Sequence, residues 1–510
     1  MSKAISSNGN RLAKNTILMY GRMVVLILVS IYTSRVLLSA LGVEDFGIYN
    51  LVGSVIAIFQ SFRTMFASAT QRFLNIEMGR CNFDKLQKVF SMSLLVNILV
   101  AIVFAVLAET IGVWFIENKI NIDPSKISDA YIVLHFSVAA AIIGIMTTSY
   151  DAVIIANERM SFFAYSSIIE TLLKLIIVFP LFLFDDSRIV WYAFLVFIVS
   201  IIIRFINSIY CHRHFKESNF IFYWDRSYFN NMLSFAGWQL FGNTSSALSN
   251  NCLNMVLNVF GGPIVNAARG IAYQVNSLIQ QFIINISIVI NPFCIKTYGE
   301  GNIEKLNKLL FFSSKIYFII ETCIVIPMFM FTEEILKIWL GVVPKYTVEY
   351  VQMILLWSIV KTFHPSIDTY FKAVGKLKIY QISEGIIFML PLLCSYITLK
   401  MGGSLILPFV YIVLFEVIDL IVIIVEAKYC AQFNLQSFMK LVLFPIAIVF
   451  VVFSCFTFGI YIFVGDILYR IMAVILLDIV FVITSYIVLL SKIEKQLMSD
   501  FILTKVHIRR

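Results

Sequence analysis

The 510-residue sequence has few charged residues. Asp, Glu, Lys and Arg make up 14% of it, against roughly 25% in a typical soluble domain. Hydrophobic residues make up 60%, and the mean hydropathy is +0.90. Charged side chains are costly inside a lipid bilayer, so a chain that avoids them is suited to one. The composition therefore excludes an ordinary soluble globular protein and predicts a polytopic helical membrane protein.

The sequence also lacks the motifs of several enzyme and metal-binding classes. Its eight cysteines are scattered, without Cys-x-x-Cys or Cys/His spacing, so they predict neither a disulfide framework nor a metal site. It contains no GxxxxGK[ST] phosphate loop, no HExxH and no GxSxG. The histidines are dispersed: His212 and His214 fall in a predicted loop, and His364 precedes Pro365. We therefore expect no enzymatic activity, no metal and no cofactor.

Long apolar segments are what the sequence does contain. The polar N-terminus runs directly into the first of them without a small-residue cleavage site, so we expect no signal peptide. Each segment has about 20 residues or more, which is long enough to cross a bilayer as a helix. The loops between them are too short to hold a soluble domain. The fourteen predicted transmembrane helices cover residues 15–38, 46–70, 87–116, 128–153, 162–184, 190–211, 229–258, 264–292, 307–331, 348–371, 379–399, 407–429, 437–461 and 467–491.

Lysine and arginine residues are concentrated on one side of this predicted membrane. With the N-terminus in the cytoplasm, most of the 39 fall in cytoplasmic segments. The predicted outer loops 39–45, 185–188 and 260–263 have few of them. This bias predicts that both termini are cytoplasmic. The net charge of +9 is then a signal of topology, and we expect no nucleic-acid partner.

A short motif occurs twice. Residues 79–88 read GRCNFDKLQK and residues 299–308 read GEGNIEKLNK, at a spacing of 220. Further on, Asp151, Ala156 and Arg159 recur as Asp368, Ala373 and Lys376 at a spacing of 217. This near-constant spacing indicates an internal duplication. The alternative is convergent composition at the membrane surface.

The duplication predicts the fold. Six predicted helices separate the two motifs, so both halves have the same orientation in the membrane and are related by an axis along its normal. We expect an all-α protein with two pseudo-symmetric six-helix bundles around a central cavity, followed by two C-terminal helices. The predicted domains are residues 1–228, 229–431 and 432–510.

Polar side chains recur at helical spacing on four of the predicted helices. Such stripes mark candidate cavity walls, because polar groups turn away from lipid. The alternative is that they only form hydrogen bonds between helices. The candidate substrate-binding residues are Arg22 and Arg35 on the first helix, Gln60 and Arg63 on the second, Gln239, Asn243 and Asn250 on the seventh, and Arg269, Tyr273 and Gln280 on the eighth.

Basic residues inside the predicted helices need a partner or a watery lumen. Lys174 can pair with Glu170 four residues earlier, and Lys361 can either extend toward the cytoplasmic interface or pair with Asp368. Arg63 and Arg269 have no acidic residue three or four positions away. Because guanidinium groups bind phosphate bidentately, they indicate an anionic substrate such as a diphosphate.

Acidic residues inside the helices have two interpretations. They are either counter-ions for the basic residues, which we favour, or sites of proton or sodium coupling. None is singled out by the sequence. They are Asp151, Glu321, Glu384, Glu416, Asp419 and Asp478.

Two stretches resemble bacterial polysaccharide flippases, the O-antigen and capsule translocases of the multidrug/oligosaccharidyl-lipid/polysaccharide (MOP) exporter superfamily. The first is SRVLLSALGVEDFGIYNLV (34–52), and the second is NAARGIAYQVNSLIQQF (266–282). The resemblance implies a transporter that moves an undecaprenyl-diphosphate-linked oligosaccharide from the cytoplasmic to the periplasmic leaflet of the inner membrane by alternating access. Arg63 looks like a head-group-binding arginine of the related lipid II flippases, and the resemblance extends, less closely, to Arg269. The implied partners are the lipid-linked oligosaccharide, membrane lipid and other polysaccharide-assembly proteins.

Two other functions stay open. The first is a cation-coupled exporter of drugs or small solutes, although the first helix has no acidic residue where that branch of the superfamily often has one. The second is a membrane glycan polymerase, which would need a substantial periplasmic loop. The longest predicted outer segment, 332–347, is short.

Overall fold

The structure is a computed structural model. It describes residues 2–118, 123–184, 187–431, 433–491 and 494–495, without the side chains of 2–14, 43, 50–51, 54–63, 115 and 430–431. Within these ranges the secondary structure is helical, with no strand. The longer helices are α1 (Ser2–Gly79), α2 (Phe83–Asn118), α3 (Ile127–Ala156), α4 (Met160–Ile176), α5 (Arg188–His214), α6 (Arg226–Gly299), α7 (Ile303–Met330), α8 (Thr332–Leu340), α9 (Thr347–Lys361), α10 (His364–Val374), α11 (Leu377–Lys400), α12 (Leu407–Ala431), α14 (Phe444–Phe463) and α15 (Ile467–Val488).

These helices confirm the predicted membrane fold. Eleven of those in the described ranges are long and apolar enough to cross a bilayer. Both α1 and α6 contain two predicted segments, joined at a kink. The remaining predicted segment, 348–371, is divided into α9 and α10 by a turn at Thr362 and Phe363. When the two parts of α1 and of α6 are counted separately and α9 and α10 are taken together, each of the fourteen predicted segments corresponds to helix.

The described residues divide into two compact units, with the boundary inside α6. We call Asn15–Leu240 the N-terminal unit and Phe241–Arg510, with Met1–Lys14, the C-terminal unit. The domain limits that the sequence suggested, at 228 and 431, stay predictions.

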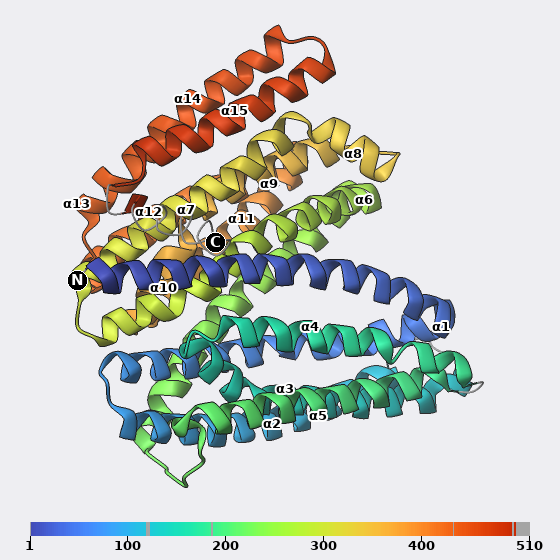
Figure 1. Ribbon diagram of the computed structural model, residues 1–510. Helices are drawn as coiled ribbons and strands as arrows, with labels where there is room; N and C mark the ends of the chain where they lie inside the picture. The colour runs from blue at the N-terminus through green and yellow to red at the C-terminus, as the bar shows by residue number, and fades with distance from the viewer. Residues whose placement is uncertain (1, 119–122, 185–186, 432, 492–493, 496–510) are drawn as a thin grey trace, which may run out of the picture. The chain divides into compact units, whose positions relative to one another are not determined.

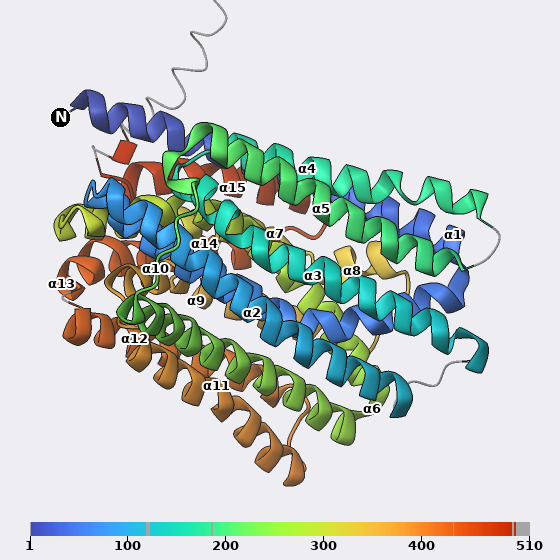
Figure 2. The same cartoon turned by 90° about the horizontal axis from the view of Figure 1, so that it is seen from below.

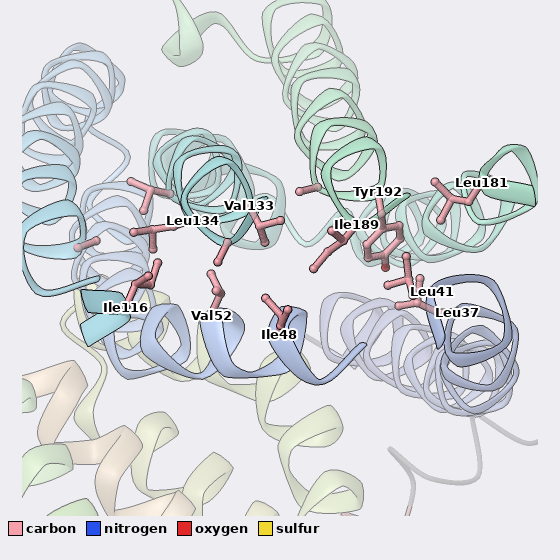
Figure 3. Close-up of a cluster of buried hydrophobic side chains, with 14 of the residues drawn as sticks. Leu37, Leu41, Ile48, Val52, Ile116, Val133, Leu134, Leu181, Ile189 and Tyr192 are labelled. Carbon is pink, nitrogen blue, oxygen red and sulfur yellow. The ribbon is translucent and has the colours of Figure 1, made fainter. Parts of the chain in front are cut away.

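In the N-terminal unit, α3 packs between α2 and α5, and the three helices lie side by side (Figure 2). Figure 3 shows the apolar core at one end of this unit. Ile48 and Val52 of α1 point toward Val133 of α3 and Ile189 of α5. Val133 and Ile189 are fully buried. Burying such side chains contributes about 1.5–3 kcal/mol each, so this cluster fixes the second part of α1 against the bundle.

In the C-terminal unit, α12 packs against α9 and α11. The last two helices, α14 and α15, form an antiparallel hairpin (Figure 1) that packs on α7. Much of the hairpin's apolar surface is exposed, as expected for helices that face lipid. After α15, Glu494 accepts two hydrogen bonds from Nζ of Lys315 on α7, at 3.1 and 3.0 Å. This buried ion pair holds the end of the described chain to the unit.

The sequence repeat has a counterpart in the backbone. Asn82 accepts a hydrogen bond from the N–H of Lys85 at 3.2 Å, and Asn302 accepts one from Lys305 at 2.9 Å. Positive φ angles recur at the spacings of the sequence repeat: 55° at Cys81 and 76° at Gly301, 220 residues apart, and 58° at Glu158 and 85° at Gly375, 217 apart. The repeat is therefore structural and not only compositional.

Candidate functional site

One cluster of polar side chains is formed by the two parts of α6. We call Asn250, Asn254, Arg269 and Tyr273 the arginine–amide cluster. The backbone reverses at Gly262, whose φ of 73° and ψ of −170° are not helical. This kink places the asparagines of the first part beside the arginine and tyrosine of the second. Three residues that the sequence singled out, Asn250, Arg269 and Tyr273, are therefore neighbours.

The guanidinium of Arg269 has several partners within this cluster. Its Nη1 donates to Oδ1 of Asn254 at 3.2 Å, and its Nη2 donates to the backbone oxygen of Asn250 at 2.9 Å. The hydroxyl of Tyr273 donates to Oδ1 of Asn250 at 2.9 Å. The guanidinium also lies 4.3 Å from the centre of the Tyr273 ring, which adds a cation–π attraction. Only Nε of Arg269 has no hydrogen-bond partner among the described atoms.

The other predicted binding residues have varied surroundings. Asn243 and Arg35 are exposed, and Gln280 and Arg22 are half-buried. In the N-terminal unit, Gln239 donates to Oγ of Ser68 at 3.3 Å, and Arg22 lies 5.0 Å above the ring of Phe163. Gln60 and Arg63 lie on α1, but their side chains fall outside the described part of the chain. Substrate binding by these residues stays a prediction.

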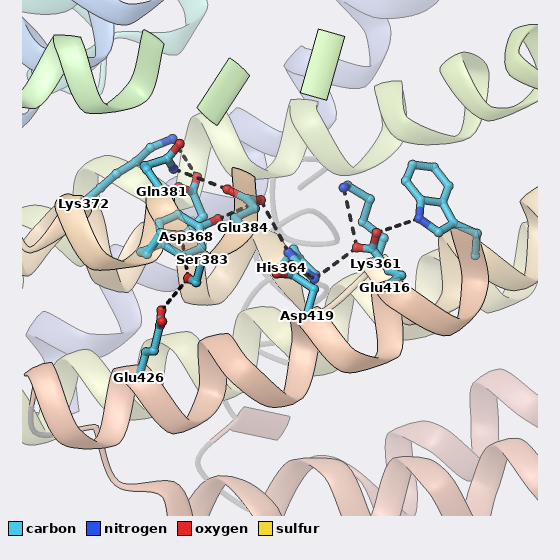
Figure 4. Close-up of polar contacts among 12 residues, drawn as sticks. Lys361, His364, Asp368, Lys372, Gln381, Ser383, Glu384, Glu416, Asp419 and Glu426 are labelled. Carbon is cyan, nitrogen blue, oxygen red and sulfur yellow. Dashed lines mark hydrogen bonds and ion pairs between the residues drawn. The ribbon is translucent and has the colours of Figure 1, made fainter. Parts of the chain in front are cut away.

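A second cluster lies deeper in the C-terminal unit. We call Lys361, His364, Glu384, Glu416 and Asp419 the carboxylate cluster (Figure 4). Lys361 and His364 stand on either side of the turn between α9 and α10, Glu384 lies on α11, and Glu416 and Asp419 lie on α12. The spacing of three residues places Glu416 and Asp419 on one side of α12, whereas Lys361 ends α9 and His364 begins α10.

Glu416 is the centre of this cluster. Its Oε1 lies 3.0 Å from Nε2 of His364 and 3.5 Å from Nζ of Lys361. Its Oε2 accepts a hydrogen bond from the indole N–H of Trp357 at 2.6 Å. Asp419 Oδ2 lies 3.5 Å from the same histidine nitrogen. The side chains of His364, Glu416 and Asp419 are 5%, 3% and 0% exposed, so these three residues are buried, whereas Lys361 is 26% exposed.

Glu384 belongs to the same cluster through the other histidine nitrogen. Its Oε1 lies 4.0 Å from Nδ1 of His364. It also accepts hydrogen bonds from the Tyr380 hydroxyl at 3.3 Å and from Nε2 of Gln381 at 3.4 Å. Phe388 lies between the two clusters: its backbone oxygen accepts a hydrogen bond at 2.5 Å from Ser249, next to Asn250, and its ring centre lies 5.0 Å from Nζ of Lys361. The two clusters are therefore neighbouring parts of one polar region of the C-terminal unit.

The charges within the carboxylate cluster itself do not balance. Three carboxylates surround a single ammonium, that of Lys361, because Asp368 pairs with Lys372 at 2.6 Å instead. The predicted Lys361–Asp368 pair is therefore wrong, and Lys361 pairs with Glu416. Buried unpaired charge is costly. An arrangement of this kind stabilises protons or cations held between the carboxylates.

Pairing explains the embedded charges of α4. The ammonium of Lys174 lies 2.6 Å from Glu170, as its spacing predicted. On α7, by contrast, neither oxygen of the buried Glu321 has a hydrogen-bond partner among the described residues. The sequence identified the acidic residues inside the helices, but it did not predict that Glu384, Glu416 and Asp419 lie together. The signals available were the three-residue spacings of Lys361–His364 and Glu416–Asp419.

Comparison with known protein families agrees with this architecture. The family model described as "Polysaccharide biosynthesis protein" matches residues 12–297, more than half of the chain. The chain belongs to the polysaccharide biosynthesis protein family. A second model, MatE, matches residues 239–397. No curated protein matches the sequence.

Solved structures of the MOP superfamily share the fold of this family member. A crystal structure of MATE in the straight conformation has a TM-score of 0.72 at 15% identity, covering 85% of this chain and 97% of that one. An outward-facing multidrug resistance MATE transporter gives 0.71 at 15% identity, with 85% and 96% covered. A MOP superfamily transporter from Pyrococcus furiosus, described by the reverse polarity of its binding pocket, gives 0.70 at 14%, with 85% and 96% covered. The two family-model matches and the shared fold together confirm the resemblance to this superfamily, and the protein is a MOP superfamily membrane transporter.

Proposed function

We propose that the protein is a flippase that moves an undecaprenyl-diphosphate-linked oligosaccharide from the cytoplasmic to the periplasmic leaflet of the inner membrane, for cell-surface polysaccharide synthesis. The observation that carries this proposal is the match of residues 12–297 to the polysaccharide biosynthesis protein family. Both termini are cytoplasmic in this proposal, as the distribution of lysine and arginine favours.

The binding residues follow from the chemistry of such a substrate. The diphosphate carries negative charge, which the guanidinium groups of Arg269, Arg63, Arg22 and Arg35 neutralise through bidentate hydrogen bonds. Amide and hydroxyl groups, including those of Asn250 and Tyr273, suit sugar hydroxyls. The hydrocarbon tail stays in the bilayer. Within the arginine–amide cluster, a phosphate would have to replace Asn254 or Asn250 as a partner of Arg269.

A cation-coupled exporter of drugs or small solutes is the second candidate. One specific observation favours it: the MatE model covers residues 239–397, which include Lys361, His364 and Glu384 of the carboxylate cluster. Buried carboxylates suit coupling to cations. A flippase and an exporter transport different substrates, so the molecule that accumulates in cells lacking the protein distinguishes the two candidates.

The decisive test is the membrane sidedness of the lipid-linked glycan in cells that lack the protein. A membrane-impermeant sugar-modifying enzyme, supplied from the periplasmic side, reports which leaflet holds the glycan. We expect the glycan to accumulate in a shielded, cytoplasmic form and to become accessible when the wild-type gene is restored. A glycan that is fully accessible yet unpolymerised would contradict the proposal and favour a polymerase. Normal glycan export with altered drug sensitivity would favour the exporter.

A further inference from the structure

We propose that His364, Glu416 and Asp419 form a site for a divalent first-row transition metal ion inside the C-terminal unit. This inference is independent of the transported substrate and goes beyond the proposed flippase function. It rests on the distances between these side chains, their burial, their missing hydrogen bonds and the charge around them.

Two of the three distances between these side chains are those of ligands to one ion. One ligand atom from each of the three residues lies within 4.8 Å of the other two. Nε2 of His364 lies 3.0 Å from Oε1 of Glu416 and 3.5 Å from Oδ2 of Asp419. Nitrogen and oxygen ligands bind Zn²⁺ at about 2.0–2.2 Å. Two ligands of one ion are then about 3–3.5 Å apart, as the angles of tetrahedral or octahedral geometry require.

The same atoms lack the hydrogen bonds that would otherwise explain their closeness. Neither ring nitrogen of His364 has a hydrogen-bond partner, and neither do Oε1 of Glu416 and both carboxylate oxygens of Asp419. All three side chains are more than nine-tenths buried. Short contacts without hydrogen-bond geometry are expected where lone pairs converge on a common point. Buried polar atoms without a hydrogen-bond partner are rare in proteins, and a bound ion would satisfy these.

The surrounding charge fits a divalent ion. A histidine that ligates a metal is neutral, which leaves the carboxylates of Glu384, Glu416 and Asp419 and the ammonium of Lys361. Their formal charges sum to −2. A divalent cation would neutralise the cluster, whereas Lys361 alone cannot.

Neighbouring groups hold one ligand in place. Trp357 donates to Oε2 of Glu416 at 2.6 Å, which fixes this carboxylate and leaves Oε1 facing His364. Such hydrogen bonds to ligating carboxylates support metal binding. A set of one imidazole and two carboxylates suits Zn²⁺, Mn²⁺, Fe²⁺ or Co²⁺ better than Mg²⁺ or Ca²⁺, which favour oxygen ligands alone.

Lys361 is a built-in competitor for this site. Its Nζ lies 3.5 Å from Oε1 of Glu416, the oxygen that the metal would use. A metal ion must therefore displace the ammonium or tolerate its repulsion. This makes a positive prediction: removal of the lysine charge should tighten metal binding.

The test is metal binding to the purified, full-length protein in detergent micelles after dialysis against a chelator. Co²⁺ alone serves as the probe, because its visible absorption reports nitrogen and oxygen coordination. We expect saturable binding of one ion per chain, with competition by Zn²⁺. His364→Gln, Glu416→Gln and Asp419→Asn should each weaken binding at least about tenfold, and Lys361→Met should strengthen it by a similar factor.

Two variants serve as matched controls. Glu426→Gln removes a carboxylate on the same helix, α12, that Ser383 hydrogen-bonds at 3.0 Å. His135→Gln removes the exposed histidine that lies 2.8 Å from Glu109. Both should bind Co²⁺ as the wild type does. The proposal is overturned if the wild type binds no divalent ion saturably, if Na⁺ alone binds there, or if His364→Gln binds normally. If a variant of His364, Glu416 or Asp419 does not fold, the Co²⁺ affinities of the wild type and Lys361→Met still test the proposal. Unchanged or weaker binding by Lys361→Met would overturn it.

Discussion

Gly42 and Gly262, 220 residues apart, have nearly the same unusual backbone conformation. Their φ and ψ angles are 80° and 172° in one case and 73° and −170° in the other. This region of conformational space is essentially restricted to glycine. Each residue joins two transmembrane segments within one long helix, α1 or α6. The internal repeat thus includes the kinks within these two long helices.

Replacing either glycine by alanine should destabilise the protein. Space is available, since no atom lies within 4 Å of an added Cβ at either position, so the backbone strain alone acts. We expect a loss of about 1–3 kcal/mol for each variant, seen as a lower apparent melting temperature. Gly21→Ala on α1 and Gly270→Ala on α6 are the controls, because these helical glycines also have open space. Equal stability of all four variants would contradict the interpretation.

The caps formed by Asn82 and Asn302 should make equal contributions. Each accepts a backbone N–H three residues later, at the start of α2 or α7. Asn→Ala at either position should cost about 1 kcal/mol. The double variant should lose the sum, because the caps are in different units. Asn→Asp should retain most of the stability. Thermal unfolding of the wild type and these five variants measures the losses, and strong non-additivity of the two alanine substitutions would refute the prediction.

Arg269→Ala should abolish transport without loss of folded protein. The residue supplies the charge of the arginine–amide cluster, and its removal leaves Asn250 and Asn254 to bond with each other or with water. Arg269→Lys should restore transport partly, since lysine keeps the charge but not the planar fork. Glycan sidedness in complemented cells is the measurement. Arg63→Ala carries the same expectation, and full activity of both alanine variants would remove these arginines from the site.

Trp357→Phe should destabilise the C-terminal unit. Phenylalanine keeps most of the apolar contact but removes the 2.6 Å hydrogen bond to the buried Glu416. A hydrogen bond to a charged group contributes about 1.5–3 kcal/mol. The same substitution at Trp339, which is 48% exposed, should have little effect. The apparent melting temperatures of the two variants provide the comparison, and an equal decrease in both would contradict the role given to the Trp357–Glu416 hydrogen bond.

Acid should loosen the start of α6 through Asp225, which lies outside the membrane-spanning helices. The backbone N–H groups of Tyr228 and Ser227 and the Tyr223 hydroxyl donate to this carboxylate and lower its pKa below the ordinary 3.8. A lowered folded pKa stabilises the folded state above pH 3.8, and this contribution is lost as the pH falls through the folded value. Hydrogen exchange of the backbone amides near residues 226–229, corrected for intrinsic rates, should therefore become faster as the pH falls below the pKa of Asp225 in the folded protein. Asp225→Ala should exchange quickly at every pH.

Local properties of the chain were predictable from its sequence. Hydropathy located the fourteen membrane segments, because the cost of placing charge in lipid acts on each segment separately. The repeated motif at 79–88 and 299–308 indicated an internal duplication, and the turns there are equivalent, with Asn82 and Asn302 as matching caps. Such turns depend on a few adjacent residues. At the kink of α6 the sequence has Gly261, Gly262 and Pro263, which predicted a short outer loop at 260–263 but not the backbone conformation of Gly262.

The tertiary structure decided which polar groups meet. The sequence named Glu416 and Asp419 as counter-ions for basic residues, but it could not place them beside His364, some fifty positions away on another helix. It presented Arg269 as unpaired, whereas the reversal at Gly262 supplies it with Asn250 and Asn254. Proximity of this kind depends on the rotation and packing of whole helices, which many distant side chains determine together. Sequence therefore established the membrane class and its repeat, and packing established the chemistry within it.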